Sequence, residues 1–335
     1  MVRDDAISDT AVKKALPVNY QLLANLEAWL GQQIVGQQDL IHKLMLALLA
    51  DGHLLVEGAP GLAKTRAIKE MAAGIEGSFH RIQFTPDLLP GDITGTDIFR
   101  PQTGVFEFQQ GPIFNNLVLA DEINRAPAKV QSALLEAMAE RQVSIGSHTY
   151  ALPDLFLVMA TQNPIEQEGT YPLPEAQLDR FLMHVRVSYP DRDAEQAILR
   201  LARNEASGAK TQPASTVSQA DIFAARQAVL NIHMAPAVEE YVVQLIMGTR
   251  HPANYDSELA NWLEFGASPR ATIALDRCAR ANAWIAGRDY VSPDDVQAVA
   301  LDCLRHRLIV SFEAEAAGIN SDLIIERLIE HIPVA

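Results

Sequence analysis

Several features that would narrow the class of this protein are scarce in its 335 residues. Only two cysteines occur, Cys278 and Cys303. No disulfide framework is therefore implied, and we expect a reducing compartment, with both cysteines as small core residues. The longest apolar run, residues 44–50, is far too short to cross a membrane. The charged residues 1–5 are not followed by an apolar segment, so we expect no secretory signal and a cytoplasmic protein.

Positive charge is also in short supply. Lys and Arg total 27 against 42 Asp and Glu, which gives a formal net charge of −15. Non-specific binding of nucleic acid needs Lys and Arg to displace phosphate counterions, so a general nucleic-acid-binding protein is disfavoured. A local basic channel is still an alternative. The 48% apolar content is typical of an ordinary packed core. At this length we expect two domains, or one large α/β domain with an appendage.

The most informative segment follows the apolar run 54–56 and reads Gly58-Ala59-Pro60-Gly61-Leu62-Ala63-Lys64-Thr65. This order predicts a buried strand, a glycine-rich turn and a helix starting at Lys64, an arrangement that cradles phosphate with backbone N–H groups. Lys64 would supply positive charge, and Thr65 would hold Mg²⁺ through its hydroxyl. Ala63 replaces the second glycine of the template G-x-x-x-x-G-K-[ST], which is tolerable if that position needs no positive φ. The alternative is a strand–turn–helix junction without a ligand.

The remaining pattern predicts a mainly parallel sheet. After the cradle helix, 64–75, further strands are expected at 79–84, 117–120, 156–160 and 183–187. The second and third are continuously apolar, as strands buried on both faces should be. The first and last alternate with polar residues, so we place them at the sheet edges. Two hairpins are expected in addition, near 96–109 and 142–152, because each contains a short turn-rich segment between strand-like runs.

The order of these patterns suggests four regions. Residues 1–20 form a loose leader and residues 21–203 an α/β core, which opens with helices at 20–30 and 38–50. Residues 204–218 are small and polar and read as a flexible connector. Residues 219–335 contain no convincing strand and form an all-helical domain, with helices expected at 219–231, 236–249, 270–286, 293–309 and 321–332.

Two further strands end in side chains that suit phosphate chemistry. The strand at 117–120 delivers Asp121 and Glu122, of which the first can reach a metal ion held by Thr65 and the second can activate a water molecule. The strand at 156–160 leads to Asn163, an amide that can hydrogen-bond a phosphate or that water. Open α/β sheets place ligands at the carboxyl ends of their strands, which favours this function over a helix cap or an Asn-Pro turn.

These three elements resemble the Walker A, Walker B and sensor 1 motifs of AAA+ ATPases. Residues 83–95, 111–114, 120–127 and 173–181 resemble, more narrowly, the MoxR family, which also uses the Ala63 form of the cradle. The match is dense over 34–190 and continues more thinly through Ser268-Pro269-Arg270. The resemblance implies an αβα sandwich with a parallel five-stranded sheet, a helical lid, and an ATPase that uses ATP and Mg²⁺.

The resemblance also implies roles for residues outside these strands. Arg180 matches an arginine finger that reaches the nucleotide of a neighbouring subunit, and Arg270 matches the sensor 2 arginine of the lid. Val35 and Gly36 match the segment beside the adenine base, and the two hairpins match insertions that point toward a ring pore. Plain alternatives are a surface ion pair, a helix-start cation and edge-strand packing. Arg125 and Arg141 lie near the motifs, but the sequence assigns neither a role.

The expected function is therefore that of a ring, a hexamer, which remodels client proteins or enzyme complexes. The resemblance implies maturation or metal cofactor insertion, with a von Willebrand factor A domain protein as a separate adaptor. A metal-chelatase ATPase subunit is the nearest alternative. A DNA-dependent motor is less favoured, because 96–109 offers only Arg100 and 142–152 has no Lys or Arg.

Overall fold

The computed structural model describes residues 18–164, 169–208 and 212–334. Most of the predicted leader and part of the predicted connector lie outside these ranges. The first described element is α1 (Val18–Gln33), followed by α2 (Gln38–Leu49). Both helices were expected, and α1 begins two residues earlier than the predicted pattern. Among the described residues, no helix combines the length and apolarity that a membrane span requires.

The centre of the fold is a parallel sheet of five strands in the order β2-β5-β8-β1-β9. Its strands are β1 (Leu54–Gly58), β2 (Phe79–Gln83), β5 (Leu117–Asp121), β8 (Leu157–Gln162) and β9 (Met183–Val187). The two strands with polar alternation, β2 and β9, are the edges, as predicted. The two continuously apolar strands, β5 and β8, are interior neighbours, which explains why every residue of β5 is buried.

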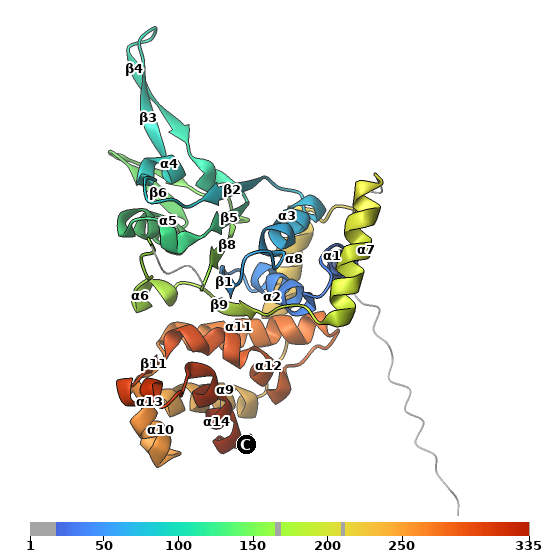
Figure 1. Ribbon diagram of the computed structural model, residues 1–335, viewed down its shortest axis with the longest axis vertical. Helices are drawn as coiled ribbons and strands as arrows, with labels where there is room; N and C mark the ends of the chain where they lie inside the picture. Colours follow the sequence, from blue (N-terminus) through green and yellow to red (C-terminus); the bar gives the residue numbers. More distant parts are fainter. Residues whose placement is uncertain (1–17, 165–168, 209–211, 335) are drawn as a thin grey trace, which may run out of the picture.

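Alternating residues of each strand face two separate hydrophobic clusters. Leu54 and Val56 face the larger cluster, which α2, α3 (Lys64–Gly74) and α8 (Gln219–Leu230) cover, whereas Leu55 faces the smaller one beneath α5 (Ala128–Glu140). The larger cluster continues without a break into the C-terminal region. The lid and the sheet therefore share one core, and Figure 1 shows the C-terminal helices lying along the β9 edge.

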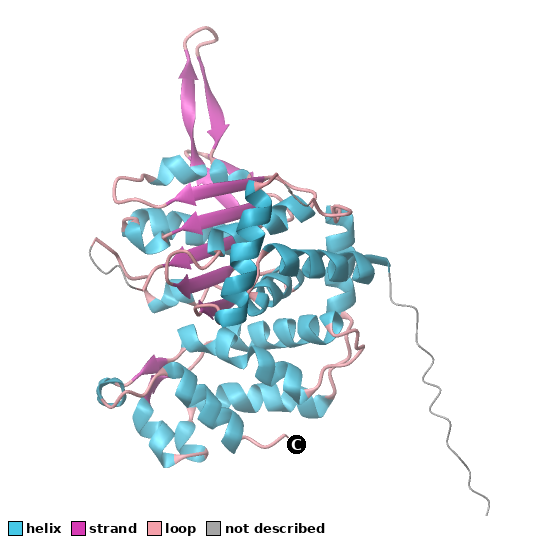
Figure 2. Cartoon of the chain, turned by 45° about the vertical axis from the view of Figure 1, so that its right-hand side comes forward, coloured by secondary structure: helices cyan, strands magenta, loops and turns pink. Residues whose placement is uncertain are grey.

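Both predicted hairpins are present. The strands β3 (Gly95–Arg100) and β4 (Val105–Gln110) pair antiparallel, and Figures 1 and 2 show them extending well beyond the sheet. The second hairpin joins β6 (Gln142–Ile145) to β7 (His148–Ala151). The rings of Phe108 and Tyr150 stack with their centroids 4.0 Å apart, so the base of one hairpin packs against the other.

The chain between the sheet and the lid differs from the prediction. The helix α7 (Arg192–Ala206) was not predicted, and its last turn occupies the start of the expected connector. Its N-cap is Asp191, whose carboxylate accepts a hydrogen bond from the Ala194 N–H. None of its residues is buried, although Ala194, Ile198 and Leu201 have the spacing of one helix face.

The C-terminal region is mainly helical, with one correction. A two-stranded antiparallel ribbon, β10 (Leu263–Phe265) with β11 (Ile309–Val310), lies where no strand was expected. Such short strands carry too few residues for a periodic signal. The ribbon also ends the predicted 293–309 helix early, at Leu304. The helices are α9 (Pro236–Arg250), α10 (Ser257–Trp262), α11 (Pro269–Ile285), α12 (Pro293–Leu304), α13 (Phe312–Ala316) and α14 (Ser321–His331).

The two cysteines occupy the packed interface of this region. Cys278 lies on α11 and Cys303 on α12, and both are fully buried, as the sequence predicts for small core residues. Burial raises the pKa of the Cys278 thiol well above its ordinary value. The neutral thiol is the poorer nucleophile, so these side chains serve packing.

Candidate functional site

The glycine-rich loop connects the carboxyl end of β1 to the first turn of α3, as predicted. Gly61 has φ +83° and Ala63 has φ +57°. The condition under which Ala63 would fit without strain, a position that needs no positive φ, is therefore not met. A left-handed conformation costs an alanine roughly 1–2 kcal/mol relative to glycine. Strain of this kind persists where the surrounding structure fixes the backbone, and it concentrates at functional sites.

A cavity of about 390 Å³ opens above this loop, and we call it the phosphate pocket. It contains three of the sequence-predicted elements: the loop from Pro60 to Thr65, the acidic pair Asp121 and Glu122, and Asn163. All of them come from the carboxyl ends of parallel strands, as the topology rule requires. The structure adds four residues that were not predicted for the site: Arg66, Arg81, Thr161 and Gln162.

The Lys64 ammonium points back across the loop. Its Nζ donates a hydrogen bond to the Gly58 carbonyl and lies 3.5 Å from the Gln162 carbonyl oxygen. Burial lowers the pKa of Lys64, while the carboxylates of Asp121 and Glu122 oppose that effect. The amine thus bonds to carbonyl oxygens at a place where phosphate oxygens could replace them, which fits an anion in the pocket.

The acidic pair has two distinct environments. Asp121 is nearly buried: its Oδ1 accepts a 2.6 Å hydrogen bond from Thr161 Oγ1, and its Oδ2 accepts two from Arg81, at 3.0 and 2.6 Å. Glu122 has φ +58° and accepts hydrogen bonds from Gln83 Nε2 (2.9 Å) and Arg125 Nη1 (3.2 Å).

The pocket suits a magnesium–nucleotide complex. The Thr65 hydroxyl and the Asp121 carboxylate line the same cavity, and hard oxygen donors of this kind are the ligands that Mg²⁺ prefers. Loop N–H groups and Lys64 suit the phosphates. Val35 and Gly36, predicted to lie beside the base, do not line this pocket. A Cβ built on Gly36 would lie 2.8 Å from the Cβ of Ala194, so this segment packs closely on the start of α7.

Arg180 and Arg270 do not line the phosphate pocket. They lie together in a cavity of about 350 Å³ at the amino ends of β1 and β9, which we call the arginine pocket. Arg141 and Arg277 line it as well. Because β1 is five residues long, roughly 16 Å of strand separates the two edges at about 3.3 Å per residue. Arg270, which matches the sensor 2 arginine, thus lies at the opposite edge of the sheet from the phosphate pocket of its own chain.

Asp179 anchors the arginine pocket to the lid. Its carboxylate accepts hydrogen bonds from Arg307 Nε (2.7 Å) and Ser268 Oγ (2.9 Å), and Arg270 Nη1 lies 3.9 Å away. Arg180 does not pair with Asp179; its Nη1 donates instead to the Leu135 carbonyl at 2.7 Å. About half of the Arg270 side chain is exposed, so it is available to a group outside this chain.

Backbone strain marks both pockets. Four non-glycine residues in the described part of the chain have positive φ: Asp51, Ala63, Glu122 and Arg141. Ala63 and Glu122 line the phosphate pocket, whereas Asp51 and Arg141 line the arginine pocket. Arg141 Nη2 donates a 2.7 Å hydrogen bond to Asp51 Oδ1, which joins the two strained residues of the second site. The coincidence of strain with both cavities supports a functional reading of each.

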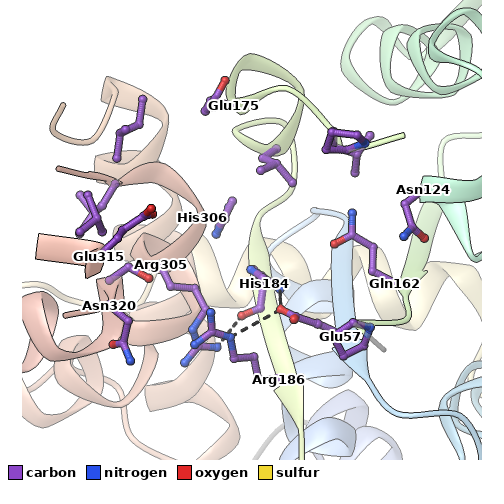
Figure 3. A pocket seen from close by; sticks show the side chains of 18 of the residues that line it. Glu57, Asn124, Gln162, Glu175, His184, Arg186, Arg305, His306, Glu315 and Asn320 are labelled. Carbon is purple, nitrogen blue, oxygen red and sulfur yellow. Dashed lines mark hydrogen bonds and ion pairs between the residues drawn. The ribbon is translucent and has the colours of Figure 1, made fainter. Parts of the chain in front are cut away.

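A third and larger cavity, about 780 Å³, lies between the sheet and the lid. It shares the lining residues Gln162 and Asn163 with the phosphate pocket. Figure 3 shows Glu57, Arg186 and His184 close together on its floor. His184 Nε2 lies 2.9 Å from Glu57 Oε2, a contact that lowers the pKa of Glu57 against the opposing effect of burial. Arg186, which lies beside Glu57, also reaches the lid, because its Nη1 lies 2.9 Å from Asp322 on α14. Glu57, the residue before Gly58, is therefore linked to the lid through Arg186.

Some of the unpredicted residues left a signal in the sequence. Arg81 and Gln83 are alternate residues of an edge strand, and the parallel register places Gln83 beside Asp121. In the sequence, their polarity indicates only that the strand lies at an edge of the sheet. Thr161 and Gln162 follow the apolar strand β8 directly, just before Asn163. Only the register of the sheet, which the sequence does not state, brings the Thr161 hydroxyl to Asp121 and the Gln162 carbonyl to Lys64.

Comparison with known proteins agrees with this geometry. Residues 53–183 match the ATPase family associated with various cellular activities (AAA), and residues 259–328 match the AAA lid domain. The chain is 46% identical to Chaperone MoxR1 of Mycobacterium tuberculosis over 300 residues, 89% of this chain and 78% of the relative. It is 42% identical to the uncharacterized protein YeaC of Bacillus subtilis over 320 residues, 94% of this chain and 95% of the relative.

A solved structure and a more distant relative complete the comparison. The crystal structure of a protein from Cytophaga hutchinsonii, assigned as an ATPase, superimposes with a TM-score of 0.88 at 44% identity. The match covers 95% of this chain and 96% of that one. The magnesium-chelatase subunit ChlI of Nicotiana tabacum is 28% identical over 217 residues, 61% of this chain and 46% of the relative.

Proposed function

Because the chain belongs to the MoxR family of AAA+ ATPases, we propose that it couples Mg²⁺-dependent ATP hydrolysis to the remodelling of client proteins or enzyme complexes. The observation that carries this proposal is the phosphate pocket. Lys64, Asp121 and Asn163, which come from three separate elements, surround one cavity at the carboxyl edge of the sheet. The chaperone part of the proposal is supported by the similarity to Chaperone MoxR1.

The sequence-predicted residues of the pocket have distinct roles in this proposal. The loop N–H groups and Lys64 hold the β- and γ-phosphates, while Thr65 and Asp121 hold the metal ion. When bound, Mg²⁺ supplies positive charge to the phosphate oxygens and keeps them aligned for displacement. Glu122 orients and deprotonates the attacking water, and Asn163 hydrogen-bonds that water or the γ-phosphate.

The positions of Arg180 and Arg270 support a ring. Neither side chain lines the phosphate pocket of its own chain, and both line the arginine pocket at the opposite edge of the sheet. A head-to-tail contact would place the arginine pocket of one subunit against the phosphate pocket of the next, and such contacts form a ring when the rotation between subunits closes. Guanidinium groups supplied in this way stabilise the charge that develops on the transferring phosphoryl group. We propose a hexamer.

The β3–β4 hairpin is the proposed contact for the client. Phe99 and Phe106 stand on it half-exposed or more, with ring centroids 5.3 Å apart, and Val105 is exposed beside them. Its one arginine, Arg100, is paired with Glu107, so the hairpin presents apolar surface rather than the free cations that a nucleic acid would need. A separate von Willebrand factor A domain protein would act as adaptor, in the cytoplasm.

A metal-chelatase ATPase subunit is the second candidate function, because the relative from Nicotiana tabacum shares part of this chain. That relative is 28% identical, against 46% for Chaperone MoxR1, and the shared part is shorter. ATPase activity would be common to both functions. Copurification of a metal-chelating partner enzyme, in place of an adaptor and client, would favour the second one.

Replacement of Glu122 tests the chemical part of the proposal. Glu122→Gln should retain ATP binding and lose turnover by about 10²–10⁴-fold, because the amide cannot accept the proton of the attacking water. Equilibrium binding of ATP and phosphate release would both be measured. Glu330→Gln, at an exposed position on α14, is the matched control and should keep full turnover. Unchanged hydrolysis in Glu122→Gln would remove Glu122 from its proposed role.

The remodelling part needs the same variant in its native cell. Tagged Glu122→Gln, saturated with ATP, should retain its client and adaptor, because the ring cannot complete its cycle. Lys64→Ala is the control, since it should not hold ATP and therefore should retain neither. A set of captured proteins that is identical for both variants would argue against ATP-dependent client binding.

A further inference from the structure

Arg81 on the edge strand β2 contacts the phosphate pocket without a role in the proposed chemistry. Its guanidinium donates two hydrogen bonds to Asp121 Oδ2, through Nε at 3.0 Å and Nη2 at 2.6 Å. The same Nη2 donates to Gln83 Oε1 at 2.8 Å. Half of the Arg81 side chain is exposed, whereas Asp121 is nearly buried.

These contacts occupy the carboxylate that a metal ion would need. Asp121 Oδ1 is bonded to Thr161, so both carboxylate oxygens already have partners. The guanidinium also carries a positive charge directly against Oδ2 and lines the pocket beside Thr65. Mg²⁺ at that carboxylate would meet a like charge at short range, which is unfavourable in a partly buried site.

The contact with Gln83 extends the effect to Glu122. Because Arg81 donates to Gln83 Oε1, the Gln83 amide must turn its Nε2 toward Glu122 Oε2, to which it donates at 2.9 Å. Arg81 therefore contacts both the Asp121 carboxylate and the amide that bonds Glu122.

We propose that Arg81 is a resting-state latch, which neutralises Asp121 until Mg²⁺ arrives with the nucleotide and displaces the guanidinium from that carboxylate. This inference rests on the proposed function, since it assumes that the phosphate pocket binds Mg²⁺ and ATP. Arg81 can move because its strand is the sheet edge and its side chain reaches solvent.

The test measures nucleotide binding as a function of Mg²⁺ and does not depend on turnover. A fluorescent ATP analogue would be titrated into the full chain in EDTA and again at increasing Mg²⁺. Arg81→Ala should weaken metal-free binding roughly 3–10-fold, because Asp121 then repels the phosphates unopposed. The Mg²⁺ concentration that gives half-maximal tightening should fall roughly tenfold, because no cation competes for Asp121.

Two further variants sharpen this comparison. Arg81→Lys keeps the charge and should stay within about threefold of the wild type in metal-free binding. Arg200→Ala removes an exposed arginine from α7, outside both pockets and both hairpins, and should change neither quantity. It controls for the loss of one positive charge from the whole protein.

Three outcomes would overturn the latch. Equal weakening of Arg81→Ala with and without Mg²⁺ would make Arg81 a direct phosphate ligand. No change under either condition would make it a surface arginine without influence on the metal. Failure of the wild-type chain to bind the analogue at all would overturn the proposed function, and the latch with it.

Discussion

Mixed rings provide the sharpest test of the idea that the two pockets belong to one catalytic site shared by two subunits. Arg180→Ala removes a proposed arginine finger, and Glu122→Gln removes the general base. Each homogeneous variant should be nearly inactive, since an arginine finger contributes roughly 10³–10⁵-fold to turnover. The separation of about 16 Å along β1 prevents Arg180 from serving its own chain.

The expected magnitude follows from counting interfaces. In an equal random mixture, an interface is complete only when an Arg180→Ala subunit supplies the phosphate pocket and a Glu122→Gln subunit supplies the arginine pocket. About one quarter of interfaces meet that condition, whatever the ring size, because each contact is head-to-tail. Phosphate release should therefore recover to roughly a quarter of the wild-type rate per subunit if sites act independently.

Two control mixtures decide the assignment. Lys64→Ala mixed with Glu122→Gln should give no recovery, because both changes damage the same pocket. Arg180→Ala mixed with Arg270→Ala should also give none, because both side chains belong to the same arginine pocket. Recovery in the second mixture would mean that Arg270 acts on its own nucleotide and would refute the placement argued above. If Arg180→Ala and Glu122→Gln subunits form mixed rings, as shown by two affinity tags, and those rings stay inactive, the shared site is refuted.

Two further predictions concern stability. Burial, followed by the nearby Arg141 guanidinium, lowers the pKa of His53 to about 4, and its Nδ1 accepts the Val158 N–H at 3.1 Å. Stability should be complete above pH 6.5 and should fall by about 3 kcal/mol as the pH drops toward 4, measured by urea unfolding. A His53→Gln variant with the same pH dependence would contradict this cause. Asp295, buried on α12, accepts hydrogen bonds from Arg288 Nη1 (2.6 Å) and Asn282 Nδ2 (2.8 Å), so Asp295→Ala should cost roughly 3–5 kcal/mol. Asp294→Ala, exposed beside it, should cost under about 0.5 kcal/mol in the same melts; equal costs would argue against the buried network.

Local sequence signals were sufficient for most of the sheet. The strand order could not be read directly, but the polar alternation of β2 and β9 correctly identified both edges. Ala63 shows the limit of this reasoning, because no local signal reports the positive φ that the loop imposes on it. The β10–β11 ribbon was missed because very short strands lack hydrophobic periodicity. The helix α7 was missed although Ala194, Ile198 and Leu201 have helical spacing.

The candidate site also combines residues that the sequence identifies with residues that only the structure reveals. Asp121, Glu122 and Asn163 each end an apolar strand, so the sequence alone places them at one edge of the sheet. Arg81 became visible only through the parallel register that brings β2 beside β5. The location of Arg270 depended on how the lid packs, and lid packing is a property of the shared core rather than of any local motif.

The strand β1 shows why the proposed shared site needs two subunits. Its carboxyl end leads into Gly58 and the phosphate pocket, and its amino end follows Gly52 and His53, which line the arginine pocket. A straight parallel strand cannot bring its two ends together, so no small motion within one chain can deliver the arginines to the phosphates. In the proposed ring, two subunits in head-to-tail contact would do so without any change in the sheet. The strained residues at both edges would then be parts of one site between chains.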